Sequence, residues 1–145
     1  MNWHDYFISL AEQVALKSKD STKVGAVIVG PTHHEIRSVG FNGFPRGVDE
    51  TIASRWERPT KYLYVEHAER NAILNAARIG IPVHGCHLYL NWEPTPCTDC
   101  AKAVIQAGIT TLIGPRRPFP KNRDWSFEVS QTMLTEAGIS LLLWP

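Results

Sequence analysis

The stretch "HLYLNWEPTPCTDCAKAVIQAGITTLIG", residues 87–114, decides the fold because its pattern predicts a strand, a helix and a second strand in direct succession. Residues 87–91 and 110–114 are apolar runs bounded by turn residues, which is typical of strands. Between them a helix is predicted from near Thr98, and Gly108 stops it. Such a unit forms a right-handed crossover between parallel strands. The stretch therefore predicts a sheet that is at least partly parallel.

The flanking segments extend this alternation. The further predicted elements are a helix over 3–17, strands over 24–30 and 36–42 that form a hairpin, a helix over 66–79, a helix capped by Asp124 and closed by Gly138, and a strand over 139–144. Residues 43–64 show no clean period, and so long an irregular segment in a compact domain is more often functional than idle. The pattern predicts an α/β fold, a three-layer α/β/α arrangement around a mixed sheet of about five strands.

Length and charge limit the classes of function. A chain of 145 residues can bury a full core without disulfides, so one domain over residues 1–145 is expected. It has no apolar run of the roughly 18 residues that a membrane span needs and no signal-peptide pattern at its amino terminus, which predicts a cytoplasmic protein. Lys and Arg number 15 and Asp and Glu 14, a net charge of +1 without the basic excess of nonspecific nucleic-acid binders. A small-molecule substrate is favoured over a membrane or a nucleic acid.

Two cysteines mark the start of the helix inside the opening stretch. Cys97 and Cys100 are three residues apart, so both thiols can point the same way, and the positive end of the helix favours their thiolate forms. Two thiolates are half of a tetrahedral zinc site, while a redox dithiol or a buried Cys pair are the alternatives. The third cysteine, Cys86, enters a buried strand and is expected to be a core residue. An odd number of cysteines argues against a disulfide framework.

A histidine and a glutamate stand at the start of the preceding helix. His67 falls in the first turn of the helix predicted over 66–79, and one strand separates that helix from the one carrying the two thiols. Helices that flank one crossover strand start at the same sheet edge, so the three side chains can converge. Three protein ligands and a water form the arrangement of catalytic zinc sites. Glu69 would then be a nonligating carboxylate that takes a proton from this water and passes it to a leaving group.

These motifs resemble a known family. "HAE" at 67–69 and "PCTDC" at 96–100 match the H-x-E…P-C-x-x-C signature of the zinc-dependent cytidine deaminase superfamily. Within it, residues 3–114 most resemble the deoxycytidylate (dCMP) deaminases of bacteria and viruses. The similar blocks are "SKDSTKVGAVIV" (18–29), "GFNGFPRG" (40–47), "KYLYVEHAERNAI" (61–73) and "PCTDCAKAVIQAGI" (96–109). "NWEP" at 91–94 departs from the short apolar approach that is typical of the family.

The resemblance implies roles for individual residues in deaminating dCMP to dUMP and ammonia. The implied site consists of the zinc ligands His67, Cys97 and Cys100, the proton shuttle Glu69, the sugar contact Asn42, and two base contacts, the backbone N–H of Ala68 and the carbonyl of Pro96. It further implies a homo-oligomer, often a hexamer, and in some members control by dCTP and dTTP.

A substrate with a 5′-phosphate also needs cationic contacts. The candidates are Lys23, Arg46 and Arg70, and for each a solvated surface charge is an equal alternative. Arg70 ranks below the other two, since its direction on the helix differs from that of Glu69 by about 100°. The basic run "PRRPFPKNR" (115–123) is open between a solvated loop, which is favoured, and a site for a triphosphate effector or single-stranded nucleic acid.

Other functions remain open at this point. One is deamination of another substrate that contains a base, such as dCTP, a free nucleoside or base, or adenosine in tRNA. Another is a nonenzymatic zinc- or nucleotide-binding regulator, which would require a fourth protein ligand for the zinc. The sequence offers no suitably placed fourth Cys or His for that role.

Overall fold

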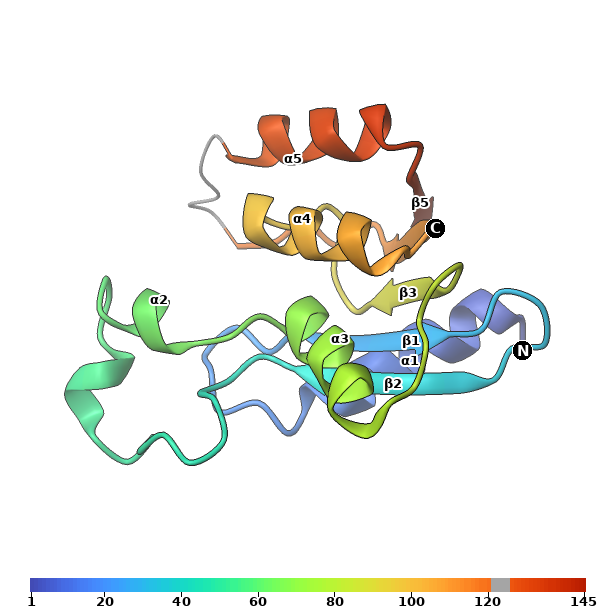
Figure 1. Ribbon diagram of the computed structural model, residues 1–145. Coiled ribbons are helices and arrows are strands. Elements are labelled where there is room, and N and C mark those ends of the chain that lie inside the picture. Colours follow the sequence, from blue (N-terminus) through green and yellow to red (C-terminus); the bar gives the residue numbers. More distant parts are fainter. Residues whose placement is uncertain (121–125) are drawn as a thin grey trace.

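A mixed five-stranded sheet with helices on both faces forms the framework of the chain (Figure 1). The structure is a computed structural model, and it describes residues 1–120 and 126–145. Its helices are α1 (Trp3–Ala15), the 3₁₀ helix η1 (Ala53–Trp56), α2 (Lys61–Tyr64), α3 (Ala68–Ile79), α4 (Thr98–Ala107) and α5 (Ser126–Glu136). Its strands are β1 (Gly25–Val29), β2 (Ile36–Phe41), β3 (His87–Leu90), β4 (Thr111–Pro115) and β5 (Ser140–Trp144).

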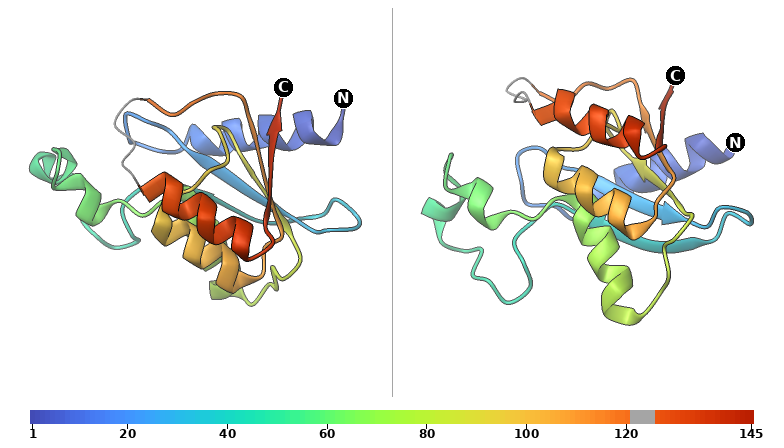
Figure 2. Two further views of the ribbon diagram at one scale, coloured as in Figure 1. Left: turned by 90° about the horizontal axis from the view of Figure 1, so that it is seen from above. Right: turned by 45° about the horizontal axis from the view of Figure 1, so that its top comes forward.

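The strand order is β2-β1-β3-β4-β5, with one antiparallel and one parallel half. Strand β1 pairs antiparallel with β2, as expected of the hairpin, and antiparallel with β3 on its other side. Strands β3, β4 and β5 run parallel, with Leu88 opposite Leu112. Helix α1 covers one face of the sheet, and α3, α4 and α5 lie on the other (Figure 2). The three-layer α/β/α prediction and the partly parallel sheet are confirmed.

The helix that leads into the predicted site begins later than expected. The sequence pattern predicted helix from residue 66, whereas α3 starts at Ala68 and His67 is its N-cap, with an extended backbone (φ −78°, ψ 153°). Glu66 does not join the helix because it forms an isolated antiparallel β-bridge with Gly43. The Gly43 N–H donates to the Glu66 carbonyl at 3.1 Å, and the Glu66 N–H donates to the Gly43 carbonyl at 2.8 Å. The far end is as predicted, since Gly80 closes α3 in the left-handed conformation that favours glycine.

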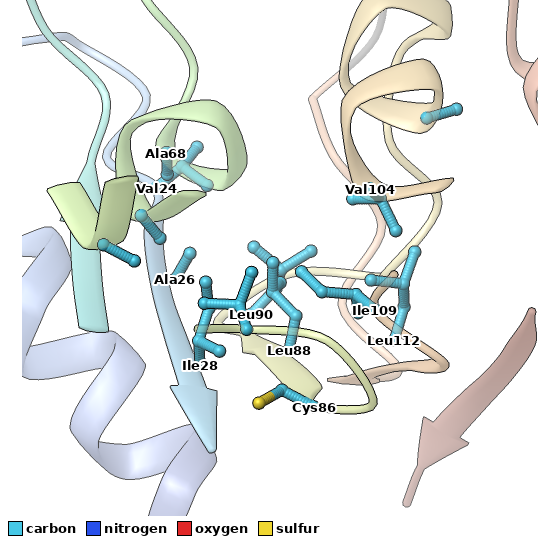
Figure 3. Packing of buried hydrophobic residues seen from close by; sticks show 14 of the residues in the cluster. Val24, Ala26, Ile28, Ala68, Cys86, Leu88, Leu90, Val104, Ile109 and Leu112 are labelled. Carbon is cyan, nitrogen blue, oxygen red and sulfur yellow. The ribbon is translucent and has the colours of Figure 1, made fainter. Parts of the chain in front are cut away.

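Two glycines let helices lie close against the hairpin. A Cβ at Gly25 would fall 2.0 Å from the carbonyl oxygen of Ala11 in α1, and one at Gly40 would fall 2.3 Å from the backbone nitrogen of Ala72 in α3. Small side chains on α3 complete this close packing, and the core continues through Leu88 and its neighbours to β4 (Figure 3). The first turns of α3 therefore lie directly against β2 at Gly40.

Residues 43–64 hold two short helical turns, η1 and α2, that the aperiodic sequence did not reveal. Four-residue elements are too short to show a period of 3.6 residues. This segment extends away from the sheet in all three views (Figures 1 and 2). The predicted Asp124 cap lies outside the described residues. Within 1–120 and 126–145, every helix is too short or too polar to cross a membrane.

Candidate active site

Three side chains predicted as zinc ligands meet where α3 and α4 begin. His67 is the N-cap of α3 and Cys97 the N-cap of α4, while Cys100 lies in the first turn of α4. The His67 Nδ1 atom is 3.3 Å from the Sγ atoms of both cysteines. The ligand atoms of the three residues all lie within 4.8 Å of one another. The crossover topology thus brings together groups that are 30 or more residues apart in the chain.

Hydrogen bonds among these groups shift their proton affinities in opposite directions. Hydrogen bonding by Cys100, together with the His67 imidazole, lowers the pKa of Cys97 to about 4. Hydrogen bonding to Cys97 raises the pKa of His67 to about 9, against the opposing effect of burial. Hydrogen bonding to Cys97 and burial raise the pKa of the Cys100 thiol. Cys97 is therefore a thiolate at neutral pH. A metal ion would compete with protons for the other two ligand atoms, on His67 and Cys100.

This donor set fits zinc. Two thiolates and one imidazole are ligands that zinc accepts in tetrahedral sites, and three protein donors leave one position open. No fourth Cys, His, Asp or Glu joins the group among the residues that the structure describes. An open position is the mark of a catalytic rather than a structural zinc site.

Glu69 lies in the first turn of α3, two residues after His67, and only 6% of it is exposed. Burial raises the pKa of its carboxyl, while the charge of His67 acts in the opposite direction. Glu69 borders a cavity of about 390 Å³. The cavity is lined by Asp20, Thr22, Val24, Asn42, Arg58, Lys61, Tyr62, Val65, His67, Ala68, Glu69, Cys97, Phe119 and Phe127. A buried carboxyl group thus lines the same cavity as two of the three predicted metal ligands, His67 and Cys97.

Comparison with known proteins agrees with this geometry. Residues 1–114 match the family described as "Cytidine and deoxycytidylate deaminase zinc-binding region". The chain belongs to this family. The cofactor of the family is zinc, and His67, Cys97 and Cys100 are the residues here with the donor set to hold it.

The chain is similar to curated relatives in sequence and to a solved structure in fold. An uncharacterized deaminase of Aliivibrio fischeri, from the luxG 3′ region, is 41% identical over 99% of the chain and 94% of its own length. The deoxycytidylate deaminase of Mus musculus is 42% identical over 78% of the chain, and the match spans 64% of the mouse enzyme. The dCMP deaminase of cyanophage S-TIM5 in its apo form superimposes with a TM-score of 0.72 at 25% identity, over 97% of this chain and 96% of that one.

The residues predicted to contact the base and the sugar lie in the wall of this cavity or next to it. Ala68 lines the cavity, and Pro96 is buried directly before Cys97. Asn42 also lines it, but its amide already holds the backbone: Oδ1 accepts the N–H of Val24 at 2.9 Å, and Nδ2 donates to the carbonyl of Thr22 at 2.8 Å. Asn42 therefore organises the loop before β1, and its predicted contact with a sugar hydroxyl remains a prediction.

The three predicted phosphate contacts lie elsewhere. The ammonium of Lys23 donates to the carbonyl of Ser18, and Lys23 is not among the residues that line the cavity beside Glu69. Arg46 donates to Asn75 at 2.7 Å and borders a different cavity of about 640 Å³. Arg70 pairs with Glu66, 3.1 Å away, and borders a separate cavity of about 270 Å³ that has His67 as a shared lining residue with the one beside Glu69. Their phosphate roles remain untested predictions, but none of these cations faces Glu69 across its cavity.

Two cations that the sequence pattern did not predict as site residues, Arg58 and Lys61, do line this cavity. Both come from the aperiodic segment 43–64, where no spacing rule points to individual residues. The available signal was the length of the segment, which marks a functional region without selecting side chains.

The described part of the basic run, residues 115–120, is tied to the "NWEP" segment. The Arg117 guanidinium lies 3.8 Å from the centre of the Trp92 ring and pairs with Glu12 at 3.0 Å. Phe119 stacks on Trp92 with a centroid distance of 5.1 Å and reaches the cavity wall. The indole N–H of Trp92 donates to the carbonyl of Lys23 at 2.8 Å. Trp92 therefore links two loops at the rim of the cavity.

Proposed function

We propose that the chain catalyses the hydrolytic deamination of a deoxycytidine nucleotide, dCMP before dCTP, to give dUMP and ammonia from dCMP. This reaction would feed thymidylate synthesis. The observation that carries the proposal is the buried Glu69 carboxyl beside the group of His67, Cys97 and Cys100 at the wall of one cavity. The relatives named deoxycytidylate deaminase in Mus musculus and Homo sapiens, 42% and 40% identical, support dCMP as the substrate.

The two cysteines and the histidine would hold the zinc. When bound, zinc acts as a Lewis acid that makes a water nucleophilic at neutral pH. The protein's part is to fix the ligand geometry, and the two N-cap positions do this because each cap is anchored by its own helix. The helix N-termini also favour the negative charge of the thiolates.

Glu69 moves the protons. The water oxygen adds to the ring carbon that bears the amino group, and the Glu69 carboxylate accepts a proton from this water. The carboxyl gives this proton to the ring nitrogen beside that carbon. It then passes the proton that remains on the added oxygen to the amino nitrogen, so a carbonyl forms, the bond between the carbon and the amino nitrogen breaks, and ammonia leaves. One water is consumed for each ammonia released, and Glu69 returns to its starting state.

Backbone and amide groups would orient the pyrimidine nucleotide. Ala68 is the first residue of α3, and the first N–H groups of a helix have no partner within it, so this N–H is suited to the base carbonyl. The carbonyl of Pro96 would accept from the amino group. Asn42 keeps one N–H and one oxygen lone pair beyond its two backbone bonds, which suits a sugar hydroxyl.

A substrate panel tests the proposal. Purified, zinc-loaded protein is incubated with deoxycytidine, dCMP, dCTP, 5-methyl-dCMP, free bases and tRNA, and released ammonia and the deaminated product are measured. Formation of dUMP with the highest kcat/KM for dCMP is expected. Absence of product from every cytosine nucleotide would overturn the proposal, and activity on tRNA or a free base would move the chain to another substrate class.

The broader setting is part of the same proposal. Residues 1–145 are proposed to act as one deaminase domain in the cytoplasm, where a reducing environment keeps the ligand thiols free. A homo-oligomer, a hexamer in the first instance, is supported by exposed apolar side chains on the outer faces of α2 and α3, Leu63, Leu74 and Ile79. Light scattering of the purified protein tests the assembly, and a monomer would refute it.

Effector binding is proposed for the cavity of about 640 Å³. Arg46 and Arg78 border it together with the aromatic ring of Phe44, a combination that suits dCTP or dTTP. Titration calorimetry with each triphosphate tests this, and binding that persists unchanged in Arg46→Ala and Arg78→Ala would exclude this cavity.

A further inference from the structure

The cavity beside Glu69 contains a buried ion pair that the base chemistry does not use. The Lys61 ammonium lies 3.0 Å from Oδ1 of Asp20, and the two residues are 7% and 5% exposed. Removing two charges from water is costly, and well-packed apolar residues in their place often stabilise a fold as well or better. Stability of the fold is therefore a weak explanation for burying this pair. Its position in the cavity wall indicates a role in ligand binding.

Asp20 holds Lys61 in a fixed place. Oδ1 of Asp20 also accepts the backbone N–H of Thr22 at 3.0 Å, and the Asp20 N–H donates to Oγ of Ser18 at 3.2 Å. These hydrogen bonds tie the carboxylate to the loop before β1. In the described part of the chain, Asp20 is the one side-chain hydrogen-bond partner of the Lys61 ammonium. An ammonium has three N–H donors, so two remain for an oxygen-rich ligand.

Arg58 adds a second cation to the same cavity. It lies three residues before Lys61, it is exposed, and it forms no ion pair with any residue in 1–120 or 126–145. A guanidinium offers a planar fork of donors that matches the oxygens of a phosphate. With Asp20 counted, the three side chains leave a net charge of +1 at this wall, the sign that an anionic group requires.

We propose that Arg58 and Lys61 form the subsite for the 5′-phosphate of the nucleotide. The assignment rests on the proposed function and names the cations that distinguish a nucleotide from a nucleoside. Asp20 is a positioning residue, since it orients Lys61 and does not itself face the anion as a donor. The same loop carries Thr22, whose carbonyl accepts from Asn42, so the phosphate subsite and the predicted sugar contact share one support.

Variants of Arg58 test the subsite. Arg58→Ala is expected to lower kcat/KM for dCMP by about 10–100-fold, the effect of losing charge-assisted hydrogen bonds, and to leave kcat/KM for deoxycytidine unchanged. Arg58→Lys should recover part of the loss. Equal losses with both substrates, or no loss with dCMP, would overturn the assignment.

Arg55→Ala is the matched control. Arg55 lies in the same segment and carries the same charge, but its guanidinium packs on the Tyr64 ring at 4.7 Å and it is not among the residues that line the cavity. Its removal should leave the preference for dCMP over deoxycytidine unchanged. A loss of preference equal to that of Arg58→Ala would mean that overall charge, and not a subsite, selects the nucleotide.

Lys61 is tested as a pair with Asp20, because removing one member alone would leave a buried charge unpaired. In Lys61→Met combined with Asp20→Asn, the preference for dCMP should fall, with thermal unfolding recorded as the check on folding. A folded double variant with the wild-type preference would remove Lys61 from the subsite, and the Arg58 series tests the subsite independently.

Binding measurements separate this inference from the proposed reaction. Calorimetry with dUMP, deoxyuridine and inorganic phosphate should show that dUMP binds more tightly than deoxyuridine, and that Arg58→Ala removes the difference. If the protein deaminates no cytosine nucleotide yet this result holds, the reaction is wrong and the phosphate subsite stands. If dCMP is deaminated but Arg58→Ala leaves dUMP binding unchanged, the subsite alone is wrong.

Discussion

The two sides of the cavity are built from different kinds of structure. The metal side, His67, Glu69, Cys97 and Cys100, occupies the starts of α3 and α4, two helices that pack in the layer on one face of the sheet. The substrate side, Asp20, Asn42, Arg58 and Lys61, comes from a loop, a strand end and the segment 43–64. Helix starts hold the predicted metal ligands, whereas side-chain hydrogen bonds hold Asn42 and Lys61 among the groups proposed to select the substrate. Substitutions on the metal side should therefore abolish the reaction. Substitutions on the substrate side should cause smaller changes in substrate affinity and in the free energy of unfolding.

The largest effect is expected from breaking the metal side. Cys97→Ala removes one of three zinc donors, so zinc should be lost and dUMP formation should fall by about 10³-fold or more, because a metal Lewis acid contributes several kcal/mol to the transition state. Zinc content by mass spectrometry and dUMP formation by chromatography measure this. Cys86→Ala is the control, since Cys86 is buried in the core among Leu88 and its neighbours and should leave zinc bound. A Cys97→Ala protein with full zinc content would exclude this residue as a ligand.

The next effect separates metal binding from proton transfer within the metal side. Glu69→Gln keeps the shape of the side chain but removes the proton acceptor, so kcat should fall by about 10²–10⁴-fold while zinc stays bound. Glu136→Gln, at the exposed end of α5, makes the same chemical change at a residue that does not line the cavity and should leave kcat unaltered. Retained activity in Glu69→Gln would show that another group moves the protons.

The positions of the metal-side residues could be predicted from the sequence more fully than those of the substrate-side residues, for a physical reason. Helix starts follow from periodicity and from residue types at the caps, so the pattern alone places Cys97, Cys100 and His67 at one sheet edge. Only the cap position of His67 was missed, because the bridge between Gly43 and Glu66 is a long-range contact that no local pattern encodes. Lys61 contacts Asp20, which is 41 residues away in the chain. This contact depends on how the aperiodic segment 43–64 folds back, and tertiary contacts determine that path.

A smaller, graded effect is expected from the substrate side at Asn42. Asn42→Ala leaves the buried N–H of Val24 and the carbonyl of Thr22 without their amide partner, which should lower the free energy of unfolding by about 1–3 kcal/mol. The KM for dCMP should rise because the loop that carries Asp20 loosens, while zinc content stays full. Urea unfolding and steady-state kinetics measure both. Asn75→Ala, where water can replace the lost bond to Val39, should cost less. Loss of zinc from Asn42→Ala would show that the two sides are not independent.

The smallest effect is expected at the rim, where Trp92 joins the two loops. Trp92→Phe removes the indole N–H that donates to Lys23 but keeps a ring for Arg117 and Phe119 to pack on. The free energy of unfolding should fall by about 0.5–1.5 kcal/mol, the usual contribution of one hydrogen bond. Zinc content and kcat should not change, since nothing at the start of α3 or α4 is touched, and KM for dCMP should rise slightly. Trp92→Ala also removes the stacking surface, so its KM should rise further as Phe119 leaves the cavity wall. Equal KM values for the two variants would show that the hydrogen bond to Lys23, rather than the ring stack, sets the position of this rim.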